Sequence, residues 1–327
     1  MRCFAPLNRI RASILVSYFT MCAIVIGGAP TNLFADEATM DDDFLKRYAE
    51  TYRFTHGLPA AIAVPSTDDA VLFLRSGPRS FVRDLYSWDA RTGAERVLLT
   101  SDQLLGGADE SLTAEEKARR ERMRLAARGI ASFDLSKDGA LVLVPLSGRL
   151  YVVERANGAT KELKSEGGYP IDPQFSPDGR SVTCVRNGDL YVIDVASGAE
   201  RRLTTGATET LTHGLAEFVA QEEMSRMHGY WWSPDGKFIA YQETDVANVE
   251  ELFIADPANP GKAPEPWRYP RPGMANAAVR LGVIPASGGD TRWIEWDREA
   301  YPYLAAATWD EGAPLTIVVQ NRRQTEE

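Results

Sequence analysis

A fifteen-residue segment recurs three times in this chain. The copies are DLYSWDARTGAERVL from Asp84, RLYVVERANGATKEL from Arg149 and DLYVIDVASGAERRL from Asp189, and the last two begin forty positions apart. In each copy an alternating segment leads into a glycine-containing turn and a second polar segment, which predicts a β-hairpin. This repeat constrains the fold more than any other feature of the sequence, because every copy must adopt the same local structure.

A second motif recurs outside these hairpins. It reads Ser-Lys-Asp-Gly from Ser136, Ser-Pro-Asp-Gly from Ser176 and Ser-Pro-Asp-Gly from Ser233, and it is typical of a tight turn between strands. Two hairpins in roughly forty residues make one four-stranded blade, so the sequence predicts an all-β fold, a β-propeller of antiparallel blades. A large sandwich is the alternative, but sandwiches rarely repeat at a fixed period. About five blades fit between residues 45 and 327, ending with a degenerate hairpin from Ala307.

The repeat is interrupted twice. The first two hairpins are sixty-five positions apart, and the surplus matches residues 102–127, which predict a helix near 113–127. Thr113 and Glu116 have the spacing of a capping box, and Glu116 can pair with Arg120 one turn later. The second surplus lies between Thr204 and Gly229. Blade insertions project from propeller faces, where binding sites are common.

The second insertion carries two adjacent acids, Glu222 and Glu223. A solvated surface turn is the simplest interpretation. The alternative is a cation site, since two carboxylates that are held together repel each other unless a cation lies between them. An ammonium or guanidinium group would satisfy both. We expect four aromatic residues to desolvate this segment partly: Phe218, Tyr230, Trp231 and Trp232.

The first 35 residues differ from the rest. Three arginines precede an uncharged, mostly apolar segment, residues 12–29, and an acidic flank follows Ala35. This pattern predicts a signal peptide, residues 1–35, and a mature propeller region, residues 36–327. An uncleaved membrane anchor is the alternative. We therefore expect a periplasmic or secreted protein without stable membrane insertion once the signal is removed.

Charge and rare residues limit the chemistry. The net charge of −10 becomes −13 when the three arginines of the signal are removed, which argues against nucleic-acid partners. Cys184 is then the only cysteine, so no internal disulfide is expected. The three histidines show no metal-ligand spacing and there is no glycine-rich phosphate loop, so we predict no cofactor or metal.

Three motifs together resemble one family. FVAQEEMSRMHGYWWSPDGKFIAY, the arginine-rich helix running into RGIASFD, and WRYPRPGMANA resemble the dipeptidyl peptidase IV family of the prolyl oligopeptidase group of serine peptidases. The helix resembles the branch with dipeptidyl peptidases 8 and 9 and the bacterial enzymes. The resemblance implies an eight-bladed propeller followed by an α/β-hydrolase domain. It implies removal of N-terminal Xaa-Pro or Xaa-Ala dipeptides, and a possible homodimer of the full-length protein.

The resemblance also implies site residues. Glu222 and Glu223 occupy the positions of the acids that hold the α-ammonium group of a peptide N-terminus. An arginine of the helical insertion holds the peptide backbone, with Arg124 the best positional match and Arg120 and Arg122 as alternatives.

One feature departs from the family. The sequence contains no Gly-x-Ser-x-Gly motif and no histidine near its C-terminal end. We therefore expect about three blades and the hydrolase domain to be missing, as in a fragment, a truncated gene or a split protein, and no hydrolysis by this chain alone. Whether the chain belongs to a working enzyme stays open. The alternative function is a stand-alone propeller that binds a partner protein without catalysis.

Overall fold

A computed structural model describes residues 43–165 and 167–327. The predicted signal peptide lies outside these residues. The chain divides into two units, residues 1–44 and 45–327, and all the strands described below belong to the second. No helix within the described ranges has the length and apolar character needed to cross a bilayer.

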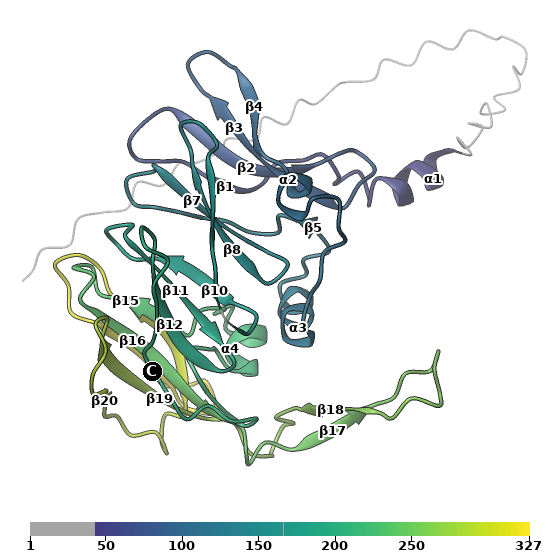
Figure 1. Ribbon diagram of the computed structural model, residues 1–327. Helices are drawn as coiled ribbons and strands as arrows, with labels where there is room; N and C mark the ends of the chain where they lie inside the picture. Colours follow the sequence, from purple (N-terminus) through teal and green to yellow (C-terminus); the bar gives the residue numbers. More distant parts are fainter. Residues whose placement is uncertain (1–42, 166) are drawn as a thin grey trace, which may run out of the picture. The chain divides into compact units, whose positions relative to one another are not determined.

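The second unit is built mainly from antiparallel sheets that follow one another along the chain (Figure 1). Three sheets have four strands each in simple sequence order, and a two-residue strand, β5 (Arg128–Gly129), adds to the first of them in parallel. Their strands are β1 (Ala60–Ala63), β2 (Ala70–Ser76), β3 (Val82–Asp89) and β4 (Glu95–Leu99); β6 (Asp134–Leu135), β7 (Leu141–Leu146), β8 (Arg149–Glu154) and β9 (Thr160–Leu163); β10 (Ile171–Phe175), β11 (Ser181–Arg186), β12 (Asp189–Asp194) and β13 (Glu200–Arg202).

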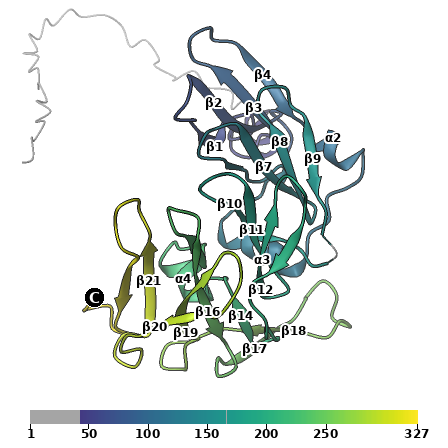
Figure 2. The ribbon, with the colours of Figure 1, turned by 60° about the vertical axis from the view of Figure 1, so that its left-hand side comes forward.

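The fourth sheet has the order β14-β16-β19-β20, with β15 also paired to β16. The chain between β16 and β19 forms a separate hairpin, β17–β18. Strands β21 and β22 form a last two-stranded sheet (Figure 2). The strands are β14 (Leu211–His213), β15 (Tyr230–Trp232), β16 (Phe238–Asp245), β17 (Glu251–Ile254), β18 (Glu265–Arg268), β19 (Ala278–Pro285), β20 (Arg292–Ile294), β21 (Tyr303–Thr308) and β22 (Thr316–Gln320).

The predicted turns form as expected. The amide of Gly179 donates to the carbonyl of Ser176 over 2.9 Å, and the hydroxyl of Ser176 donates to Asp178 over 2.6 Å. The motifs at Ser136 and Ser233 make the same two bonds, so the three motifs join β6 to β7, β10 to β11 and β15 to β16. These bonds are local, which is why short sequence motifs predict them.

The hydrophobic core lies between successive sheets. One cluster joins Leu143 and Leu150 of the second sheet to Val182 and Ile193 of the third. Equivalent clusters join the first sheet to the second, the third to the fourth, and the fourth to β21. Sheets that pack face to face in chain order are propeller blades, so the predicted all-β class and four-stranded antiparallel blades are confirmed.

Four helices are present among the described residues: α1 (Asp43–Glu50), α2 (Ser101–Leu105), α3 (Ala114–Arg122) and α4 (Phe218–Glu223). The helix predicted over 113–127 ends five residues early, because Arg124 adopts a left-handed backbone conformation with φ of 53°. The predicted capping box is half right. Thr113 accepts a bond from the amide of Glu116, but the carboxylate of Glu116 turns to Arg120 instead.

Candidate ammonium-binding site on the fourth-blade insertion

The predicted acidic pair lies on a segment that interrupts one strand position of the fourth sheet. β14 pairs with the end of β16 and β15 with its beginning, so two segments share one strand position. The backbone of Gln242 on β16 bonds to both of these segments. Its carbonyl accepts from the amide of Gly214, and its amide donates to the carbonyl of Gly229. The chain therefore leaves the strand at Gly214 and re-enters it at Gly229. We call residues 215–228 the excursion.

The two ends of the excursion can approach each other this closely only because residue 229 is glycine. A Cβ atom on Gly229 would lie 2.5 Å from the carbonyl oxygen of Gly214, far inside van der Waals contact. One further bridge joins Leu215 to His228. The two ends of the excursion thus lie against each other, and α4 forms between them.

Buried charge holds α4 in place. Arg226 donates to the carboxylate of Glu217 over 3.2 Å, to the carbonyl of His228 over 2.8 Å and to the carbonyl of Leu304 over 2.9 Å. Glu217 is the residue before α4, but its side chain makes no capping bond, since it accepts from Arg226 and Gln242 instead. Burial lowers the pKa of Arg226, and the charge of Glu217 opposes that effect.

The second anchor is His228. Its Nδ1 lies 2.9 Å from the carboxylate of Asp172 in the third sheet, and Arg119 of α3 lies 3.4 Å from the same carboxylate. The hydrogen bond to Asp172 raises the pKa of His228, against the opposing effects of burial and of Arg119. Excursion, third blade and α3 are therefore joined by one polar cluster.

The structure places the candidate acids on the last turn of α4. Glu223 is exposed, and the side chain of Glu222 is 25% exposed. Arg124 lies just beyond α3, and its Nη2 is 4.0 Å from Oε2 of Glu222, while 80% of its side chain is exposed. The structure thus brings Arg124 and Glu222 together across two insertions that are far apart in sequence.

The three candidate arginines have different surroundings. Arg120 is buried and donates to Glu110 over 2.8 Å and to Glu116 over 2.9 Å, so the predicted pair with Glu116 is confirmed and its guanidinium is fully engaged. Arg122 is half-buried and donates to Gln221 over 3.1 Å. Arg124 is the exposed one. Burial lowers the pKa of Arg122, while the nearby charges of Glu222 and Glu121 favour its protonated form.

The aromatic surroundings differ from those expected. Tyr230 is fully buried and donates its hydroxyl to the carbonyl of Thr183, while Trp231 and Trp232 pack against core clusters. Only Phe218 lies on α4 itself. The ring of Phe218 makes edge-to-face contacts with Trp267 of β18 and with Tyr269, whose ring centroids lie 6.5 Å and 5.1 Å away.

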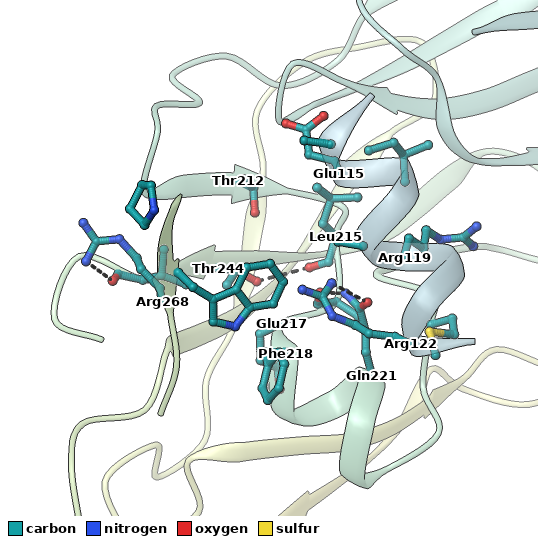
Figure 3. Close-up of a pocket in the computed structure, with 18 residues that line it drawn as sticks. Glu115, Arg119, Arg122, Thr212, Leu215, Glu217, Phe218, Gln221, Thr244 and Arg268 are labelled. Atoms are coloured by element: carbon teal, nitrogen blue, oxygen red, sulfur yellow. Dashed lines mark hydrogen bonds between the residues drawn. The ribbon is translucent and has the colours of Figure 1, made fainter. Parts of the chain in front are cut away.

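Phe218 and Trp267 line a cavity between α3, α4 and the β17–β18 hairpin (Figure 3). Figure 3 shows the side chains of Arg122 and Gln221 next to each other, one from each of the two helices. The sequence analysis named Arg122 only as an alternative to Arg124 and did not single out Trp267. The only available signal was the WRYPRPG motif, whose position in space no pattern reveals. Within the described part of the chain, no three His, Cys, Asp or Glu side chains are grouped to hold a metal ion.

Blades of four strands packed in chain order, with charged insertions beside one another, define a propeller-type domain. A family model described as the dipeptidyl peptidase IV (DPP IV) N-terminal region matches residues 136–327, and the chain belongs to this family. The resemblance inferred from the sequence motifs is therefore confirmed.

Several known proteins are similar to this chain. Dipeptidyl peptidase 8 of Mus musculus is 28% identical over 250 residues, covering 64% of this chain and 28% of that protein. Prolyl endopeptidase FAP of Mus musculus is 33% identical over 84 residues, or 24% of this chain and 11% of that protein. The crystal structure of Porphyromonas gingivalis dipeptidyl peptidase 4 matches with a TM-score of 0.63 at 18% identity, covering 86% of this chain and 38% of that chain. The chain thus spans less than a third of the length of either sequence relative.

Proposed function

We propose that this chain is the substrate-recognition part of a secreted or periplasmic serine dipeptidyl peptidase that removes N-terminal Xaa-Pro or Xaa-Ala dipeptides. The catalytic triad would come from sequence beyond this chain. Family membership supports the general class. The observation that carries the proposal is the acidic pair, Glu222 and Glu223, on one short helix with the exposed Arg124 4.0 Å from Glu222.

The chemistry of the pair suits a peptide N-terminus. An α-ammonium group has three donors and one positive charge, so it can bond to Glu222 and Glu223 together and relieve their repulsion. The guanidinium of Arg124 can donate to a peptide carbonyl beside it. Carboxylates at a fixed distance from a nucleophile would select cleavage two residues from the N-terminus.

A binding experiment tests this directly. The purified chain is titrated with an Xaa-Pro dipeptide amide and with its N-acetylated form, and binding is followed by NMR. We expect Glu222→Gln or Glu223→Gln to weaken binding of the free amine by about ten-fold or more, since each removes a charge-assisted bond. The acetylated peptide, which has no ammonium group, should be unaffected. Equal weakening of both ligands would show that the acids only support the fold.

A stand-alone propeller that binds a partner protein is the second candidate. The exposed apolar residues Phe253 and Ile254 of β17 favour it. Reading the coding sequence after Glu327 separates the two. A hydrolase domain with a Gly-x-Ser-x-Gly motif supports the peptidase, and an unrelated gene supports the partner-binding propeller.

A further inference from the structure

The cavity beside α4 has a volume of about 380 Å³ and mostly apolar walls. Leu215 and Val246 line it together with the rings of Phe218 and Trp267. Its volume is within the range of small-molecule sites, roughly 300–1,000 Å³. Glu222 and Glu223 are not among the lining residues, so the cavity is distinct from the proposed ammonium site.

One cation at this cavity lacks an ion-pair partner. The guanidinium of Arg122 lies 5.3 Å from the centroids of both Phe218 and Trp267, and its Nη1 donates to the neutral side chain of Gln221. Its Nε is buried and makes no hydrogen bond with any described residue. In residues 43–165 and 167–327, no carboxylate lies within 4.0 Å of Arg122, although Glu222 is near enough to interact with it.

The other cations that line the cavity, Arg119 and Arg268, are already engaged. Arg119 pairs with Asp172, and Arg268 donates to the carbonyl of Val249 over 3.0 Å and pairs with Glu251 over 3.5 Å. The buried acid at the cavity, Glu217, pairs with Arg226. Arg122 is therefore the lining cation that can take a further anion. A half-buried guanidinium without a direct ion-pair partner costs free energy, and an incoming carboxylate would reduce that cost.

We propose that this cavity binds a small aromatic carboxylate, with its ring against Trp267 and Phe218 and its carboxylate on Arg122. Apolar walls select the flat ring, and the fork of the guanidinium matches the two carboxylate oxygens. The same chemistry occurs in a free aromatic acid and at the C-terminal aromatic residue of a peptide. The inference does not depend on the proposed peptidase role, since it needs neither Glu222 nor Glu223.

The probe is 2-naphthoate, titrated into the purified chain and followed by NMR, with methyl 2-naphthoate as the uncharged control. The acid should bind about ten-fold or more tightly than the ester, because only the acid offers a charge-assisted bond to Arg122. Arg122→Met should remove this preference and leave ester binding unchanged. Arg122→Lys should restore only part of it, since lysine keeps the charge but not the planar fork.

Two variants serve as matched controls. Arg124→Met removes an exposed cation two residues away and should leave 2-naphthoate binding intact. Glu222→Gln should not weaken it either, whereas that variant weakens the dipeptide amide if the ammonium site is correct. Thermal unfolding confirms that each variant folds. If Arg122→Met does not fold, Trp267→Leu replaces it and should weaken the acid and the ester together.

The two ligand sources are separated by comparing indole-3-propionate with an acetylated tetrapeptide that ends in tryptophan. Tighter binding of the peptide identifies a C-terminal residue as the occupant, and tighter binding of the small acid identifies a free aromatic acid. The proposal is overturned if 2-naphthoate and its ester bind equally well, if neither binds, or if folded Arg122→Met keeps the full preference for the acid.

Discussion

The third blade and the excursion of the fourth blade are stabilised in different ways. In the blade, continuous strand pairing places apolar residues such as Val185, Leu190 and Ile193 in the core with no exposed surface. In the excursion, a few directional polar contacts of Arg226 and His228 hold the segment against the neighbouring sheets. Apolar burial tolerates small shifts, whereas charged hydrogen bonds require one geometry. The excursion is therefore suited to holding Glu222 and Glu223 at fixed positions.

The largest effect is expected from Arg226→Met. This change leaves the carboxylate of Glu217 buried without its cation and frees the carbonyl of Leu304. Breaking a buried pair on one side typically costs about 3–5 kcal/mol of unfolding free energy. Urea unfolding measures the loss. Adding Glu217→Gln should recover part of it, and a loss no larger than that of an exposed substitution would show that polar contacts do not hold the excursion.

Leu190→Ala tests the blade side of the comparison. Leu190 is fully buried between the third and fourth sheets, and its truncation should cost about 2–5 kcal/mol of unfolding free energy. Hydrogen exchange should show that amides of the blade and of α4 lose protection together. Val97→Ala on β4, whose side chain is half exposed, is the control and should change stability little.

A smaller effect should depend on pH. Asp172 raises the pKa of His228 in the folded protein, with Asp134 acting in the same direction and Arg119 opposing. The contact therefore stabilises the fold fully below the unfolded-state pKa of about 6.5, and this stabilisation is lost as pH rises through the higher folded-state pKa. The side chain is 57% exposed, so solvent screening keeps the effect modest.

Unfolding of wild type and His228→Gln should be compared between pH 5 and 8. The wild type should lose stability relative to the variant as pH rises across this range. A constant difference would mean that the charge of His228 does not contribute to anchoring the excursion.

The smallest effect is expected at the hairpin. Lys262 pairs with Glu265 at the start of β18, and both side chains are more than half exposed. Pairs of this kind are screened by water and salt. Lys262→Gln should leave both the unfolding midpoint and 2-naphthoate binding unchanged. A change in binding alone would show that this exposed pair influences the cavity wall that Trp267 forms.

Local patterns predicted much of this fold. The glycine turns at Gly158 and Gly198 and the Ser-Pro-Asp-Gly turns are formed by bonds between residues a few positions apart, so the sequence reveals them directly. The β17–β18 hairpin was not predicted, because it has no counterpart in the repeat. The early end of α3 was also missed, since nothing local marks Arg124 for a left-handed conformation.

The sequence by itself determined the repeat, the blade class, the presence of two charged insertions and the family motifs around Glu222. The sequence also predicted that Arg120 pairs with Glu116, but only the tertiary structure decided what Arg122 and Arg124 contact. Arg120 binds carboxylates of its own insertion, whereas Arg122 contacts Gln221, ninety-nine residues away. Helical periodicity places Arg120 and Arg122 on different faces, but it does not reveal what each face contacts. The partners of Arg122 and Arg124 come close only when separate blades pack together.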